Sequence, residues 1–169
     1  DPTAIEILQE SAQKETQAIE QIFRQKTTRE GLSAEWRSYM LAAGYASSSV
    51  QEVARTADLI VANQSSPSQA DHRADLETFL FESGRPILLV PYTLKQPKPI
   101  ERVLIAWNGS REAARATFDS LPILKQASSV EVLVIDPPER GDREKEFAGS
   151  DLAATLARHG INVTLTTQD

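Results

Sequence analysis

The sequence has 169 residues, of which 40% are hydrophobic and 25% charged, with a formal net charge of −6 and no cysteine. The length and composition suit one globular domain, the negative charge disfavours nucleic-acid phosphates, and the lack of cysteine excludes disulfides and thiol chemistry. No apolar run approaches the roughly 20 residues that a membrane span needs, and the first residues lack a secretory signal, so we expect a cytoplasmic protein without membrane or nucleic-acid partners.

The amino-terminal part of the chain alternates between helical and strand patterns. Apolar residues at three- and four-residue spacings predict a long helix over Thr3–Thr28, which Gly31 ends. Alternating apolar and polar residues predict a strand over Ala34–Met40. The patterns that follow predict a helix opened by serines, a buried strand, a second helix and another strand, at Val50–Thr56, Asp58–Ala62, Gln69–Glu82 and Pro86–Val90.

A proline-rich linker, Pro91–Ile100, precedes the most regular stretch of the chain. Val103–Trp107 is an unbroken apolar run, which predicts a central strand that is buried on both faces of a parallel sheet. A Gly-containing turn, a helix over Arg111–Lys125 and a strand over Val130–Ile135 follow it, which makes a βαβ unit. The remaining patterns predict a loop, a helix and a last strand, at Asp136–Arg143, Glu144–His159 and Ile161–Thr167.

Three of these stretches carry a resemblance to a known family. Val103–Ala114 resembles the first strand and turn of a universal stress protein domain, Ala57–Val61 its fourth strand, and Ser83–Pro91 its last strand. The resemblance implies an α/β fold, a three-layer sandwich with a mostly parallel five-stranded sheet of adenine nucleotide alpha hydrolase-like type. It also implies the strand order 3-2-1-4-5.

The chain contains an internal repeat that starts in mid-period. A helix, a glycine and a strand occur near Gly31 and recur at Gly160, with an offset close to one domain of this family. We interpret residues 1–95 as the second part of one repeat and residues 101–169 as the first part of another. The chain then resembles a fragment of a bacterial tandem protein that spans the end of one domain and the start of the next.

The two parts together supply one set of strands for a circularly permuted domain. This arrangement places Asp58–Ala62 beside Val103–Trp107, where the two repeats meet. Ala34–Met40 and Ile161–Thr167 compete for the place next to Val130–Ile135, and the short connection favours Ile161–Thr167. The other candidate and the long first helix are then free to mediate a homodimer, because an unpaired strand edge invites association.

The candidate ligand contacts lie after the first strand of the βαβ unit and at the end of its second strand, at Asn108, Gly109, Ser110 and Asp136. In nucleotide-binding members of the family, an Asp stands where this chain has Asn108, and a glycine-rich loop after the fourth strand holds the phosphates. Asn63–Ser83 contains no glycine. The resemblance therefore implies no bound cofactor, and ATP stays an alternative ligand that lacks its phosphate loop.

Residues that would indicate catalysis are sparse. His72 and His159 lack metal-ligand spacing, and we find no pair of groups whose spacing demands acid–base or nucleophilic chemistry. The family resemblance implies a non-catalytic stress-response protein that acts through a ligand or a partner of unknown identity. The alternatives are a nucleotide-binding domain with weak hydrolysis, and a dimerisation scaffold.

Overall fold

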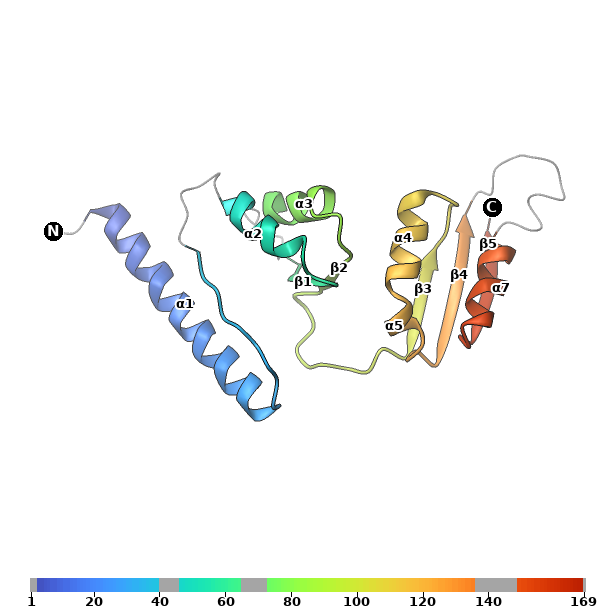
Figure 1. Cartoon of the computed structure of the whole chain (residues 1–169), viewed down its shortest axis with the longest axis horizontal. Coiled ribbons are helices and arrows are strands. Elements are labelled where there is room, and N and C mark those ends of the chain that lie inside the picture. The colour runs from blue at the N-terminus through green and yellow to red at the C-terminus, as the bar shows by residue number, and fades with distance from the viewer. Residues whose placement is uncertain (1–2, 40–45, 65–72, 136–148, 169) are drawn as a thin grey trace. The chain divides into compact units, whose positions relative to one another are not determined.

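The computed structural model describes residues 3–39, 46–64, 73–135 and 149–168. The chain divides into two compact units, Asp1–Ser48 and Ser49–Asp169, which are considered separately (Figure 1). Within the described residues, no helix is long and apolar enough to cross a membrane.

The first unit contains one long helix, α1, over Ala4–Arg29, which confirms the predicted helix. Its start is fixed by a capping box: the Thr3 hydroxyl oxygen accepts from the Glu6 backbone N–H at 3.3 Å, and the Glu6 carboxylate accepts from the Thr3 N–H at 2.6 Å. The hydrogen bonds from the backbone and side chain of Thr3 lower the pKa of Glu6. No residue of α1 is buried.

The prediction of a strand over Ala34–Met40 was wrong for its described residues, because residues 32–39 form no strand. A strand needs a hydrogen-bonded neighbour, and alternating polarity does not supply one. The segment packs on α1 instead: the rings of Trp36 and Phe23 have centroids 5.4 Å apart and are tilted by 48°. Trp36 is therefore a packing residue of the first unit.

The second unit begins with a small parallel pair of strands. Helix α2 (Ala46–Ala54) precedes β1 (Ile60–Asn63), and helix α3 (Arg73–Glu82) joins β1 to β2 (Ile87–Val90). These four elements correspond to the helices and strands expected in this region. The two helices are linked by polar contacts, since Gln51 Nε2 donates to the Glu82 carboxylate at 2.9 Å.

The rest of the second unit is a three-stranded parallel sheet with the order β3-β4-β5. The helix predicted over Arg111–Lys125 is broken into two, because Pro122 has no backbone N–H to continue the first helix. The elements in chain order are β3 (Arg102–Ala106), α4 (Arg111–Asp119), α5 (Leu121–Leu124), β4 (Ser129–Ile135), α7 (Ser150–Arg158) and β5 (Val163–Gln168).

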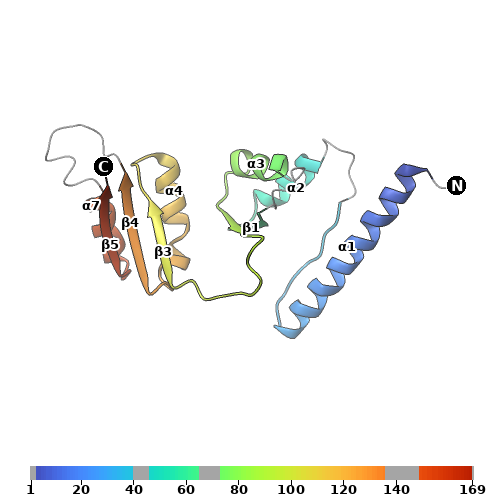
Figure 2. The same cartoon turned by 180° about the vertical axis from the view of Figure 1, so that it is seen from behind.

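One face of this sheet forms the core. Figure 1 shows α4 and α7 in front of the strands, and Figure 2 shows the strands from the side that carries no helix. The core residues come from the strands, α5, α7 and the start of the β5 segment: Ile105, Leu124, Val130, Val132, Leu152, Leu156 and Ile161. Leu152 and Leu156 are the residues of α7 that are buried in this core.

The single five-stranded sheet is not what the described residues form. They contain two parallel sheets, β1-β2 and β3-β4-β5, and β1 does not pair with β3. The prediction that Val103–Trp107 is central and buried on both faces was also wrong, because β3 is an edge strand and Leu104 is 57% exposed. The apolar run indicates that both faces of β3 can be buried, but it does not identify the segments that would bury them.

The choice between the two candidates for the third strand is confirmed. β5 pairs in parallel with β4, from Val130 opposite Val163 to Ile135 opposite Gln168. Helix α7 leads directly into β5, so the connection is short and local. Within each of the two sheets, the strands therefore have the expected neighbours: β1 pairs with β2, and β4 pairs with β3 and β5.

Candidate functional site

The turn between β3 and α4 contains three of the four candidate site residues. The Asn108 side-chain oxygen accepts from the Ser110 N–H at 3.0 Å, and the Ser110 hydroxyl oxygen accepts from the Ala113 N–H at 3.1 Å. Gly109 has φ 73°, a left-handed conformation that glycine adopts without strain. The turn is thus an Asx-turn that leads into a capped helix start.

This turn uses much of its own hydrogen-bonding capacity. The Asn108 oxygen and the Ser110 hydroxyl both serve the backbone, so they stabilise the chain reversal before they can serve a ligand. Among the described residues, the Asn108 Nδ2 amide group has no hydrogen-bond partner, and Asn108 is exposed. The turn can therefore donate a hydrogen bond to a neutral or anionic acceptor.

Charged groups flank the start of α4. Hydrogen bonds from its own backbone N–H and from the Ser110 side chain lower the pKa of Glu112, and nearby Arg111 lowers it further. The Arg111 Nη2 atom lies 3.8 Å from the Glu112 carboxylate, and both side chains are exposed. A negative charge at a helix start is favoured by the helix dipole, so this carboxylate stabilises α4 and competes with an incoming anion.

A second helix begins at the same end of the sheet. Gly149 is the N-cap of α7 with φ 81° and makes no side-chain cap. A Cβ atom at Gly149 would lie 3.0 Å from Leu165 Cδ1, 3.1 Å from Val134 Cγ2 and 3.5 Å from Trp107 Cδ1. The left-handed φ and the close approach both favour glycine here, and the start of α7 lies against the end of β3.

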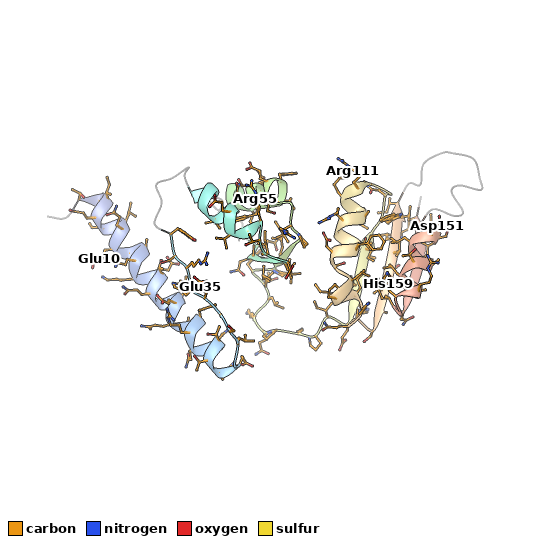
Figure 3. All side chains as sticks on the ribbon, viewed as in Figure 1. Glu10, Glu35, Arg55, Arg111, Asp151 and His159 are labelled. Carbon is orange, nitrogen blue, oxygen red and sulfur yellow. The ribbon has the colours of Figure 1, made fainter. Side chains whose placement is uncertain are left out.

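The carboxyl edge of the sheet therefore joins the starts of α4 and α7 around Trp107. Figure 3 shows Arg111 and Asp151, in the first turns of these helices, and His159 at the other end of α7. The sequence did not single out Gly149, although a glycine before Ser150 and Asp151 is a recognisable helix start. Trp107 packs against the core.

The fourth candidate, Asp136, lies outside the described residues, and so does His72. Asp136 directly follows β4, which ends at Ile135. Within the described part of the chain, no three His, Cys, Asp or Glu residues are grouped so that they could hold a metal ion. The residues that are brought together are thus Trp107, Asn108, Gly109, Ser110 and Gly149.

The second candidate site is the side of the three-stranded sheet that no described helix covers, here called the outer face. It comprises alternate residues of the three strands: Leu104, Ala106, Glu131, Leu133, Ile135, Thr164, Thr166 and Gln168. Leu104 is 57% and Ile135 60% exposed. At the β5 side the face is polar, and the Thr166 hydroxyl donates to the Glu131 carboxylate at 2.6 Å.

The outer face continues into the edge of β3, which pairs with no other strand among the described residues. The Trp107 N–H donates to the Leu133 carbonyl at 2.8 Å, so in a parallel ladder the odd-numbered residues of β3 face β4. The N–H and C=O groups of Leu104 and Ala106 then face the open side of β3. Apolar side chains and free backbone groups on one edge strand form a surface that can accept another strand.

Neither a scan against protein-family models nor a search of curated proteins finds a match for this chain.

Proposed function

We propose that this chain is a universal stress protein-like module that is non-catalytic and acts by binding a partner or ligand. One feature supports the proposal: the strand, Asn108-Gly109-Ser110 turn and helix follow the order that the resemblance implies. We further propose a cytoplasmic location without a membrane partner, in line with the expectation from the sequence, and no nucleic-acid partner, because the net charge is −6.

The observation that carries the proposal is the graded polarity of the outer face. Its apolar residues belong to β3 and β4, whereas β5 contributes threonines and a glutamine. Exposure to water alone does not explain why apolar residues lie on only one side of the face. Exposed apolar patches are typical of interaction surfaces. We therefore propose that the partner covers β3 and β4 and leaves β5 in solvent.

We propose that β1 pairs with β3 in the assembled protein, which gives a five-stranded sheet in the order β5-β4-β3-β1-β2. This is the order 3-2-1-4-5 in the strand numbering of the family that the chain resembles. By the same alternation, Ile60 donates to Pro86 and Gln64 donates to Val90, so the backbone of Val61 faces the open side of β1. Val61 is 61% exposed. Two open apolar edges in one chain can pair within the chain or between two copies, and the second case makes a homodimer.

A matched pair of substitutions on the outer face tests this proposal. Leu104→Lys places a charge on the face where the partner should lie, and Thr164→Lys places the same charge on the polar side. If β3 is covered in solution, Leu104→Lys lowers the free energy of unfolding by about 2 kcal/mol or more, while Thr164→Lys changes it by less than about 0.5 kcal/mol. Equal, small effects in urea denaturation would mean that the face is bare.

The alternative function, nucleotide binding with weak hydrolysis, is favoured by one observation. The Asn108 amide group is exposed and free of described partners beside the start of a capped helix, where phosphates bind in many folds. The glycine-free Asn63–Ser83 segment and the lowered pKa of Glu112, which keeps that carboxylate charged, disfavour a triphosphate.

Thermal unfolding with millimolar ATP and magnesium distinguishes the two functions. A micromolar site would stabilise the unit that contains α4 by about 4 kcal/mol, whereas the proposed non-catalytic function predicts no shift. Asn108→Ala is the control, because a shift that survives it would place the nucleotide elsewhere.

A further inference from the structure

Helix α1 presents an apolar stripe that its own unit leaves exposed. Ile5 is 67%, Leu8 70%, Ile19 49% and Ile22 54% exposed. Together with Ala12 and Glu15, they occupy alternating three- and four-residue spacings, which is the a/d pattern of a coiled coil. We call the row Ile5, Leu8, Ala12, Glu15, Ile19 and Ile22 the seam.

The neighbouring side of α1 is already occupied by the chain itself. Thr16, Glu20, Phe23 and Thr27 are half-buried at four- and three-residue spacings, and Trp36 packs on Phe23. The folded-back segment 32–39 therefore covers this side of the helix and leaves the seam free. Figure 3 shows Glu10 on the helix and Glu35 on the segment that runs back along it.

The seam is symmetric along its own length. Read from either end, its spacings are three, four, three, four and three residues, with a large apolar pair at each end and the pair Ala12 and Glu15 at the centre. A surface with this symmetry is complementary to a second copy of itself that runs in the opposite direction, related by a two-fold axis.

We infer that α1 pairs with α1 of a second copy in an antiparallel coiled coil. The inference rests on the homodimer included in the proposed function, and it assigns the seam of α1 as the contact surface of that homodimer. Ile5 of one copy meets Ile22 of the other, Leu8 meets Ile19, and Ala12 meets Glu15; the two-fold axis repeats each contact.

Charges on the helix select the antiparallel direction. A parallel pair in register would place Glu15 against Glu15, Lys26 against Lys26 and Arg29 against Arg29, three layers of like charge in the contact. In the antiparallel pair, Glu15 faces the small Ala12, while Lys26 and Arg29 lie beyond the overlap in solvent. The two helix dipoles also oppose each other only in the antiparallel pair.

The polar side of α1 favours a protein partner over a lipid surface. Acidic and basic residues occur together outside the seam and pair along the helix, with Lys14 to Glu10 at 2.8 Å and Arg24 to the half-buried Glu20 at 2.6 Å. Helices that lie on anionic membranes carry mainly Lys and Arg on this side. A second copy of the chain is complementary to the apolar seam and is also compatible with the mixed charges beside it.

Sedimentation velocity of the full chain over a range of concentrations tests the inference with matched variants. Ile22 and Ile7 are both isoleucines of α1 with 54% exposure, but only Ile22 belongs to the seam. The wild type is expected to form dimers, and Ile22→Glu to raise the dissociation constant at least about a hundredfold, because each dimer carries the change twice. Ile7→Glu is expected to leave the constant within about threefold.

Cysteine cross-linking tests the direction of the pair, since the wild-type chain contains no cysteine. Leu8→Cys and Ile19→Cys chains are mixed and oxidised under mild conditions. The antiparallel pair predicts a disulfide between the two different variants in preference to disulfides between identical ones. A parallel pair predicts the reverse, and that outcome would overturn the inference.

The outcomes separate failure of the surface from failure of self-association. A wild-type chain that stays monomeric at every concentration overturns both. A dimer that Ile22→Glu leaves intact overturns the α1 pair and leaves self-association through another surface, such as the open edge of β3. Binding of the wild type to anionic vesicles, lost in Ile22→Glu without a dimer, assigns the seam to a membrane and also overturns the inference.

Discussion

Replacing Gly149 by alanine tests how tightly the start of α7 is held against the carboxyl edge of the sheet. Two costs arise from the structure. An alanine at φ 81° adopts the left-handed conformation, which costs about 1–2 kcal/mol. Its Cβ would also lie 3.0 Å from Leu165 Cδ1 and 3.1 Å from Val134 Cγ2, and relieving such crowding costs about 1–3 kcal/mol.

Gly160, just beyond the other end of α7, provides the matched control. It has φ 78°, and a Cβ there would meet no atom within 4 Å. Gly160→Ala therefore has the conformational cost but no steric one. Both variants also lower the conformational entropy of the unfolded chain, and this stabilising effect is the same in each. The difference between the two free energies of unfolding should be about 1–3 kcal/mol, with Gly149→Ala the less stable.

Urea unfolding followed by tryptophan fluorescence measures both variants. A Trp36→Phe background removes the signal of the first unit, so the emission reports Trp107 beside Gly149. The Cβ of Gly149→Ala would lie 3.5 Å from Trp107 Cδ1, which is an ordinary van der Waals contact, so the test rests on the difference in stability. Equal stabilities of the two variants would refute the close approach at this edge.

Three other substitutions or conditions test the packing and capping described above. Asn108→Ala removes the oxygen that accepts from the Ser110 N–H and should cost about 0.5–1.5 kcal/mol in urea unfolding; no loss would mean that the turn does not depend on this bond. Leu156→Ala empties a fully buried site and should cost about 2–5 kcal/mol by the same assay, and a loss under about 1 kcal/mol would contradict the core. The lowered pKa of Glu6 means that its charged form stabilises α1 above the ordinary Glu pKa, and that this support is lost as pH falls through the lowered value. Amide signals of the first turn of α1 should therefore fray on acidification, and a Glu6→Gln variant, frayed already at neutral pH, should show no such transition.

The sequence predicted the helices and most strands because their signals are local. Apolar periodicity located α1 and β4 to within a residue or two, and the glycines marked chain reversals. The interruption between α4 and α5 was missed, although Pro122 is a local signal that a helix cannot continue. Local patterns of this kind depend on neighbours in the chain, which a sequence displays directly.

Strand pairing could not be predicted in the same way. Val103–Trp107 has the composition of a strand covered on both faces, yet the described structure covers one face and leaves Leu104 exposed. Ala34–Met40 alternates like a strand, yet its described residues pack on α1 through Trp36. Pairing depends on which distant segment supplies the hydrogen bonds, and the composition of a strand does not identify that segment.

The candidate site was predicted in part. Asn108 and Ser110 form a strand-to-helix turn in which their side-chain oxygen atoms accept from the backbone, and a ligand contact at these residues stays a prediction. Gly149 was missed because its role depends on Trp107, Val134 and Leu165, which are far from it in the chain or in other strands.

The central claim is that the open edge of β3 is completed by another strand in solution, and amide hydrogen exchange along β3 tests it most directly. The amides of Val103 and Ile105 face β4, and those of Leu104 and Ala106 face the open side, so one strand contains its own control. If β1 pairs with β3, all four amides exchange slowly, and exchange of Leu104 and Ala106 becomes faster in a Val61→Pro variant, because proline on β1 breaks the added ladder. Slow exchange at Val103 and Ile105 with fast exchange at Leu104 and Ala106 in the wild type would contradict the claim.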